Sequence, residues 1–420
     1  LIDRLAKIPA PDDLSRNGSR AFSQTAFGPF ALLVCHMFAE RQQRVLDLIR
    51  LYRDTPLRVG IVPNAIPFSF TDSVDFMLRG VQDAVFNHYV YSRILEATAP
   101  TAWRLDALPL VSLARAEATK RRTPRALIQD ALLRLPFPRL KGFGPVLPLL
   151  LSCAALLNDR KQADRSFDLA AYSAKPTEWL FPAEELAARC MPLSLKRAVQ
   201  DARRNLGHPL PEVGERAKKR PLRIMSPVYS QNDPYRIRLA LLRHRGYRLA
   251  SVQHGANYGN LESIGGIALE YAQHAFFTWG WTAHAGTPVN AHPLPHPTLA
   301  RIAGKHREKS PALILVGTEM STYSYRLKSR PQAGALPAYR QSKTRFLSLM
   351  ERFFENRDTS GPETPKPALY YRPYFKVAGG LEDADHIRRV LPAIGICTGD
   401  LTEHMLSCSL LVLDHYGTTL

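Results

Sequence analysis

The segment Gln253-His254-Gly255 follows a strand-like run, Tyr247–Val252, and joins an imidazole to a glycine. His254 has the only type of side chain that titrates near neutral pH when unperturbed, so it can deprotonate a hydroxyl group or contact a phosphate. Gly255 permits a tight backbone path at this point. The structural alternative is a histidine that only hydrogen-bonds a backbone carbonyl.

Polar residues continue around this segment, and ligands of open α/β sheets bind beyond the carboxyl ends of the strands. We therefore expect a loop that lines a cleft and contains Gln253, Gly255, Asn257 and Tyr258. If His254 only binds phosphate, the carboxylates of Glu262 and Asp233 are the alternative bases.

Arg372 ends a second apolar strand, Ala368–Arg372, and precedes a proline. A guanidinium held there could bind a phosphate or a sugar carboxylate through two parallel hydrogen bonds. An ordinary surface salt bridge is the alternative.

A third loop follows the buried strand Leu410–Leu413 and carries Asp414, Gly417, Thr418 and Thr419. If a helix starts after Gly417, its first N–H groups and the two hydroxyls form a phosphate cradle, although a threonine can also simply cap a helix. The expected donor-binding residues are Arg372, Asp414, Gly417, Thr418, Thr419 and Gly317.

The sequence lacks the motifs of several other enzyme classes. There is no Gly-Lys-Ser/Thr phosphate loop, no Gly-x-Ser-x-Gly elbow, no His-Glu-x-x-His and no Gly-x-Gly-x-x-Gly after a strand. The pair Asp383 and Asp385 could hold a metal ion, but it opens a predicted helix, where acidic side chains suit the helix dipole. We therefore expect no metal site.

Two series of strands and helices must position these loops. The first begins with a helix over Phe30–Arg53, a strand over Leu57–Val62 and a helix over Ser73–Thr98. Residues 110–220 have a mainly helical pattern. Alternation then resumes with predicted elements over Leu222–Ser226, Pro234–Arg245, Tyr247–Val252 and Phe276–Trp279.

The second series begins with the apolar strand Ala312–Val316. Its further predicted elements alternate between helix and strand and cover Tyr339–Asn356, Ala368–Arg372, Ala384–Val390, Ile394–Cys397, Leu401–Cys408 and Leu410–Leu413. The chain ends where another helix is expected, so we expect this second sheet to be truncated at its C-terminal side.

Strands that alternate with helices predict parallel sheets and an α/β fold. A chain of 420 residues is long enough for two domains, each with its own core. We expect an N-terminal domain over residues 1–285 with a helical insertion at 110–220, a linker rich in proline over 286–310, and a partial domain over 311–420.

The net charge indicates which classes of binding partner the protein attracts. The chain has 56 Lys and Arg against 37 Asp and Glu, a net charge of +19, which attracts nucleic acid, anionic lipid or phosphorylated substrates. The basic runs are scattered, so we interpret the excess as favouring the anionic inner membrane surface. The five cysteines contain no Cys-x-x-Cys pair, which favours a reducing cytoplasm.

Several segments resemble the sugar transferase family found in bacterial O-antigen and capsule gene clusters. They are Gln253–Gly259, Phe277–Trp281, Tyr371–Pro373 and Asp414–Leu420, together with an N-terminal segment that contains Asp83, Asn87 and His88. More distantly, the Gln-His-Gly loop and the terminal Asp-to-Thr loop are similar to those of capsule Kdo transferases and teichoic-acid polymerases, which are GT-B enzymes that use cytidine-linked donors.

The resemblance implies a GT-B-like α/β fold, in which two Rossmann-like domains face a cleft. It places His254 at the catalytic cleft and implies that Arg372, Thr418 and Thr419 hold the donor phosphates. It implies a metal-independent glycosyltransferase without a bound cofactor, whose sugar donor is linked to CMP or UDP. The acceptor would be a glycan or a lipid-linked glycan, and the protein would be cytoplasmic or peripheral on the inner membrane.

Two other functions remain open. A polyol-phosphate transferase of the teichoic-acid type would use the same cleft and leave a phosphate in the product bond. A non-enzymatic RNA-binding or scaffold protein would need a basic face with interleaved aromatic residues. Because the basic residues are dispersed and no RNA-binding signature occurs, we expect no nucleic acid partner.

Overall fold

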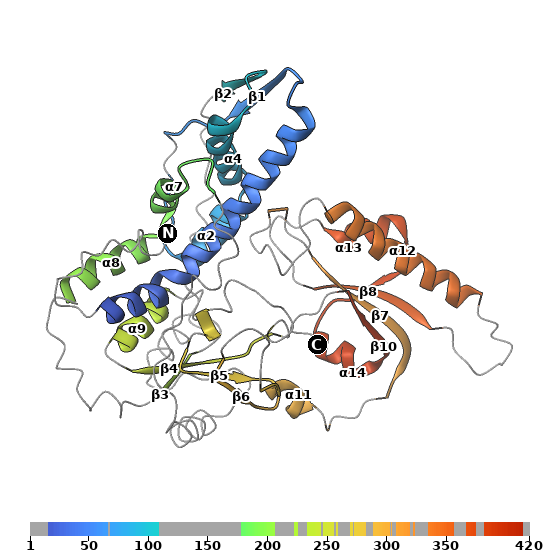
Figure 1. Cartoon of the computed structure of the whole chain (residues 1–420). Helices are drawn as coiled ribbons and strands as arrows, with labels where there is room; N and C mark the ends of the chain where they lie inside the picture. Colours follow the sequence, from blue (N-terminus) through green and yellow to red (C-terminus); the bar gives the residue numbers. More distant parts are fainter. Residues whose placement is uncertain are drawn as a thin grey trace. The chain divides into compact units, whose positions relative to one another are not determined.

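The computed structural model divides into two compact units, each built on parallel sheets (Figure 1). Unit 1 comprises residues 1–254 and 261–297, and unit 2 comprises residues 255–260 and 298–420. The structure describes residues 16–65, 68–108, 178–205, 222–225, 233–244, 247–255, 258, 269–271, 273–282, 289–302, 304, 308–319, 322–323, 335–356, 367–374 and 382–414.

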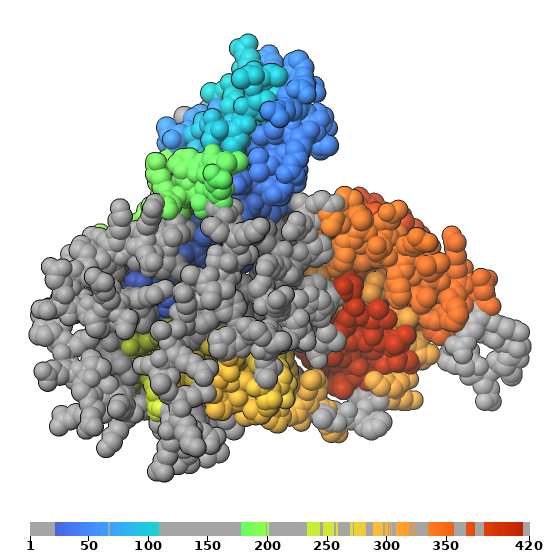
Figure 2. All heavy atoms as spheres, in the orientation of Figure 1, coloured from blue at the N-terminus to red at the C-terminus, as the bar shows by residue number. Residues whose placement is uncertain are grey.

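Helix α2 (Arg16–Tyr52) is the longest element of unit 1 and contains an internal proline, Pro29. It packs against α9 (Asp233–His244) near one end and α4 (Ala84–Thr98) near the other (Figure 1). By length and composition, Phe22–Tyr52 could cross a membrane, but 67% of its apolar window is buried inside the protein. Such burial is typical of a core helix. Its C-terminal end lies at the surface, as the blue atoms in Figure 2 show.

The single helix expected over Ser73–Thr98 is interrupted, so that prediction is wrong. The structure has α3 (Ser73–Phe76), a π-helical turn η1 (Met77–Val81) and then α4. Asp83 stands outside the helix in extended conformation, and its side chain accepts a hydrogen bond of 2.8 Å from the N–H of Phe86. An acidic side chain that caps the first turn starts a new helix, which explains the break.

The described residues of unit 1 form two parallel sheets. The smaller pairs β1 (Leu57–Ile61) with β2 (Trp103–Ala107). The larger has the order β3-β4-β5-β6, which follows the chain, with strands at Leu222–Met225, Arg248–Val252, Ala275–Thr278 and Ala291–Pro293. Strand β5 is buried along its whole length, as expected for a strand covered on both faces.

Two elements lie inside residues 286–310, the segment that the sequence predicts as a linker. Strand β6 completes the larger sheet of unit 1, and helix α11 (Pro297–Ile302) begins at the boundary of the units. The sequence does not indicate this strand, because Ala291–Pro293 has only three residues, includes a histidine and a proline, and contains no apolar run.

The expected helical insertion at 110–220 is described only in part. Two helices, α7 (Ala183–Cys190) and α8 (Leu193–Asn205), agree with the mainly helical pattern predicted for this segment. Both bury apolar side chains in unit 1. Residues 109–177 and 206–221 lie outside the described residues.

Within the described residues, unit 2 contains a four-stranded parallel sheet with the order β10-β7-β8-β9. Its strands are β7 (Ser310–Thr318), β8 (Ala368–Tyr374), β9 (Gly395–Ile396) and β10 (Cys408–Leu413). The helices between them are α12 (Leu336–Glu355), α13 (Asp383–Val390) and α14 (Leu401–Ser407). These elements confirm the strand and helix alternation predicted for this half of the chain.

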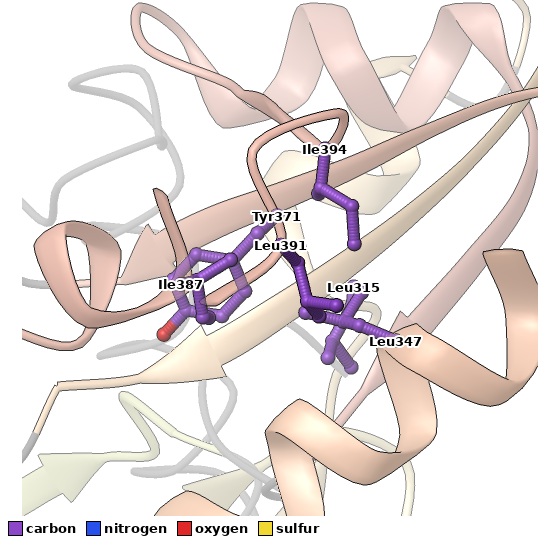
Figure 3. Packing of buried hydrophobic residues seen from close by; sticks show 6 residues of the cluster. All are labelled: Leu315, Leu347, Tyr371, Ile387, Leu391 and Ile394. Atoms are coloured by element: carbon purple, nitrogen blue, oxygen red, sulfur yellow. The ribbon is translucent and has the colours of Figure 1, made fainter. Parts of the chain in front are cut away.

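Each face of the unit 2 sheet has its own apolar core. On one face Leu315 and Tyr371 pack with Leu347 of α12 and Ile387 of α13 (Figure 3). On the other face Ile314 and Val316 of β7 belong to a second cluster, against which Leu401 of α14 packs. Since successive strand residues point to opposite faces, both clusters draw on the same apolar run. The sheet is thereby covered on both sides.

Candidate functional site

Gln253 connects two loops at the carboxyl end of the larger sheet in unit 1. Its backbone N–H donates to the carbonyl of Phe277 at 2.8 Å. Its side-chain oxygen accepts hydrogen bonds from the N–H of Trp279 at 2.7 Å and from the indole N–H of Trp281 at 2.9 Å. The buried amide therefore fixes the loop after β4 to the loop after β5, and with it the position of the next residue.

That next residue, His254, has a side chain that is 46% exposed, and its Nδ1 lies 3.9 Å from Oε2 of Glu270. The Glu270 side chain is only 5% exposed. The separation is too long for a hydrogen bond, but it suits an ion pair when the imidazole is protonated. The structure thus places the predicted histidine at a strand end, exposed and beside a buried carboxylate.

Sequence reasoning did not single out Glu270. The sequence signal is an acidic residue between two apolar ones, in the run Leu269-Glu270-Tyr271. The structure buries all three side chains. A buried carboxylate needs a partner, and the strand-end histidine is a suitable one.

The other residues predicted beside His254 are placed as follows. Gly255 is half-buried and Tyr258 is buried, and both belong to unit 2. Asn257 and Glu262 lie outside the described residues.

Asp233 is fully buried and joins three helices. Its Oδ2 accepts from the N–H of Ser73 at 2.9 Å and from the hydroxyl of Ser194 at 2.5 Å, and its Oδ1 accepts from Arg236 at 2.6 Å. Through these hydrogen bonds the carboxylate links α9 to α3 and α8. Both side chains of the Asp233–Arg236 pair are 0% exposed, so the links lie in the protein interior. This geometry favours a structural role.

The N-terminal residues that carried the family resemblance also have internal partners. Asn87 is fully buried; its oxygen accepts from Arg41 at 2.7 Å and its amide donates to the carbonyl of Val81 at 2.9 Å. The ring of His88 contacts the carbonyl of Gly60 at 2.9 Å. These side chains hold α4 against α2 and β1.

Unit 2 has a second group of polar side chains at the carboxyl ends of its strands. From β7 the chain adds β8 and β9 on one side, then returns to place β10 on the other side of β7. The strand order therefore reverses between β7 and β10. The carboxyl ends of these two strands, called the crevice below, are the usual ligand position in open α/β sheets. Thr318 and Glu319 come at the end of β7, and Asp414 comes directly after β10.

Asp414, one of the predicted donor-binding residues, spans this crevice. Its carboxylate accepts from the N–H of Thr318 at 3.0 Å and from the hydroxyl of Tyr339 at 2.6 Å. The ammonium of Lys343 lies 3.9 Å from the same carboxylate. Burial raises the pKa of the Tyr339 hydroxyl far above its ordinary value, and the negative charge of Asp414 acts in the same direction.

Lys343 and Asp383 form a buried ion pair next to Asp414. The ammonium bonds to Oδ2 of Asp383 and donates to the carbonyl of Thr318 at 3.1 Å, while Arg340 donates to Oδ1 of Asp383 at 2.7 Å. Burial by itself would raise the pKa of the Asp383 carboxyl, but the two cations outweigh it and hold that pKa below its usual value. Asp383 opens α13, as predicted, and is also the anionic centre of this cluster.

Glu319 and Tyr371 complete the cluster. Burial raises the pKa of the Glu319 carboxyl, and the neighbouring charge of Asp383 raises it further. Burial also raises the pKa of the Tyr371 hydroxyl well above its usual value, with Glu319 as the next contribution. Among the described residues, the Oε1 atom of Glu319 and the hydroxyl of Tyr371 have no hydrogen-bond partner.

Arg372 points to the opposite face of the sheet from this cluster. Its Nη2 donates to the carbonyl of Gly399 at 2.5 Å, just before α14. Gly317 lies under the ring of Tyr371, where a Cβ atom would come within 2.4 Å of the ring. Gly417, Thr418 and Thr419 lie outside the described residues, so the predicted phosphate cradle stays a prediction. No group of three His, Cys, Asp or Glu suited to a metal ion occurs in the described part of the chain.

The fold and the two strand-end groups define an α/β protein with parallel sheets and charged or titratable residues at their carboxyl ends. Residues 14–420 match the LIC12162 family transferase, so the chain belongs to this family and the protein is a transferase. No curated protein and no solved structure matches the chain.

Proposed function

We propose that the protein is a glycosyltransferase that moves a sugar from a nucleotide-activated donor to an acceptor of a surface polysaccharide such as O-antigen or capsule. The observation that carries the proposal is the exposed His254 at the end of β4, 3.9 Å from the buried carboxylate of Glu270. A histidine oriented beside a carboxylate is suited to take a proton from a hydroxyl group.

In this mechanism the imidazole of His254 accepts the proton of the acceptor hydroxyl. The acceptor oxygen then forms a bond to the anomeric carbon of the donor sugar. The bond between that carbon and the phosphate oxygen of the donor breaks, and the nucleotide leaves with the electron pair. Glu270 stabilises the imidazolium that forms, since an opposite charge within about 4–6 Å favours the protonated ring.

The donor nucleotide would bind to unit 2, at the crevice where the strand order reverses. Two α/β units with parallel sheets are consistent with a GT-B enzyme, in which an acceptor domain and a donor domain face a cleft. In this proposal Arg372, Thr418 and Thr419 contact the donor phosphates, and catalysis needs no metal ion.

The experiment that tests the proposal is a binding screen followed by product analysis. Free CMP, UDP and their sugar conjugates are titrated calorimetrically into the protein, and each conjugate that binds is incubated with lipid-linked acceptors. We expect binding of at least one nucleotide sugar and transfer of a sugar without phosphate. A phosphate retained in the new bond would assign a polyol-phosphate transferase instead, and absence of all nucleotide binding would contradict both assignments.

A further inference from the structure

The cluster at the carboxyl end of the unit 2 sheet has unequal charges. It contains two cations, Lys343 and Arg340, and three carboxylates, Glu319, Asp383 and Asp414. Both cations are bonded to Asp383. An incoming phosphate would thus meet paired cations and three acidic groups, so this part of the crevice is unsuited to an anion.

Two buried atoms in the cluster have no hydrogen-bond partner within the described ranges: Oε1 of Glu319 and the hydroxyl of Tyr371. Glu319 is 6% exposed and Tyr371 is 0% exposed. Unsatisfied buried polar atoms are rare in native proteins, and each one needs an explanation. A ligand that supplies hydrogen bonds to both atoms is such an explanation.

The two side chains come from neighbouring strands and approach the same end of the sheet. Glu319 follows Thr318, the last residue of β7, and Tyr371 lies on β8, which pairs with β7. Figure 3 shows the Tyr371 hydroxyl at the edge of the apolar cluster, beyond Ile387 and away from Leu347. The ring is fixed against Gly317, so the position of the hydroxyl is set by the fold.

We propose that Glu319 and Tyr371 bind a pair of neighbouring hydroxyl groups on the neutral, sugar-like part of a ligand. The Oε1 atom of Glu319 can accept from one hydroxyl, and the Tyr371 phenol can donate to or accept from another, so the two residues match a vicinal diol. This inference rests on the proposed function, because the ribose and the transferred sugar of a nucleotide sugar both carry such diols.

The test compares Glu319→Gln and Tyr371→Phe with the unaltered protein, using titration calorimetry with UDP, CMP and their sugar conjugates. We expect each substitution to weaken binding about tenfold, the scale of one or two lost hydrogen bonds. The matched controls are Tyr370→Phe, on the same strand but packed against the opposite face, and Glu355→Gln at the exposed end of α12. Both controls should keep the unaltered affinity.

Deoxy ligands identify which diol is bound. If a 2′-deoxynucleotide loses affinity for the unaltered protein and none for Glu319→Gln, the ribose is the ligand group. If the substitutions weaken only the sugar conjugates and leave free UDP and CMP unaffected, the transferred sugar is the ligand group. Either result supports the inference.

Stability distinguishes this role from a structural one. The Tyr371 hydroxyl has no partner in the free protein, so Tyr371→Phe should leave the melting temperature unchanged or raise it. Unchanged nucleotide-sugar affinity in both variants overturns the inference and leaves the proposed function intact. Failure of the unaltered protein to bind any nucleotide or nucleotide sugar overturns both.

Discussion

Asp414 and Thr318 join the ends of two strands that are far apart in the chain. The N–H of Thr318 donates to the two carboxylate oxygens at 3.0 and 3.2 Å, and its hydroxyl donates to Oδ1 at 3.3 Å. The two residues are 96 positions apart, and they meet because β10 pairs with β7. The contact fixes the crevice at which the strand order reverses, and with it the polar cluster of unit 2.

Replacing Asp383 with asparagine should destabilise unit 2. Lys343 would remain buried with only the more distant Asp414 carboxylate, at 3.9 Å, as an anionic partner, and breaking a buried ion pair costs about 3–5 kcal/mol. The pKa of Asp383 is lower in the folded protein, so its contribution is present above the unfolded pKa and is lost as the pH falls through the folded pKa. Urea unfolding at several pH values should show both the loss and a weaker acid dependence in Asp383→Asn.

The control for this prediction is Asp385→Asn. Asp385 pairs with Arg388 on the same helix, and both side chains are more than half exposed, at 54% and 57%. Such surface pairs contribute about 0–1 kcal/mol. Equal, small effects of the two substitutions would show that the Lys343–Asp383 pair does not stabilise the fold.

Gly317→Ala should also destabilise unit 2, because the new methyl group would lie 2.4 Å from the Tyr371 ring and 2.5 Å from its hydroxyl. Overpacking of this kind costs about 1–3 kcal/mol. Gly304→Ala is the matched control, since nothing lies within 4 Å of its added methyl group. Adding Tyr371→Leu to Gly317→Ala should recover part of the loss in thermal unfolding; no recovery would mean that the strain lies elsewhere.

The order of the elements was largely predictable, because the buried strands are short apolar runs such as Ala312–Val316. Strand β2 was missed although its apolar residues alternate with arginine and aspartate, which is a strand pattern. Strand β6 was missed because it has only three residues and ends in a proline. The break before α4 depends on a local cap at Asp83, which a periodicity count over the whole segment does not detect.

The candidate sites were predictable only where a residue stands within two positions of the end of an apolar strand, as His254 and Asp414 do. Lys343 and Tyr339 lie in an amphipathic helix and carry no local signal. Their importance comes from contacts with Asp383 and Asp414, which are 40 and 75 positions away. Pairings over such distances follow from the sheet topology, which a single sequence does not specify.

Arg372→Ala should weaken binding of the donor nucleotide by about 1.5–3 kcal/mol, the range for hydrogen bonds to charged groups. In the structure the Arg372 guanidinium reaches the carbonyl of Gly399, at the carboxyl end of the sheet, where a phosphate could replace or join this contact. Calorimetric titration with the nucleotide that binds best measures the loss. Arg388→Ala, which removes an exposed arginine of α13, is the control, and identical affinities in both variants would exclude Arg372 from the donor site.

The net charge of +19 predicts peripheral binding to anionic membranes. The protein should co-sediment with vesicles that contain anionic lipid and stay in the supernatant with neutral vesicles. High salt should release it, because surface electrostatic attraction is screened. Equal recovery in the two supernatants at low salt would contradict the prediction.

His254→Asn should lower kcat by about a hundredfold to ten-thousandfold, the usual effect of losing a general acid or base. Donor affinity and melting temperature should stay nearly unchanged, because the His254 side chain is 46% exposed at a strand end. Glu270→Gln should lower kcat to a smaller extent, because the imidazolium that forms on His254 would lose the neighbouring negative charge. Asp233→Asn should instead act on stability, because both of its oxygens bond to residues of the core. Steady-state kinetics over a range of pH, with thermal unfolding of each variant, measures these effects. Wild-type turnover in His254→Asn, or a variant that simply unfolds, would assign His254 a structural role.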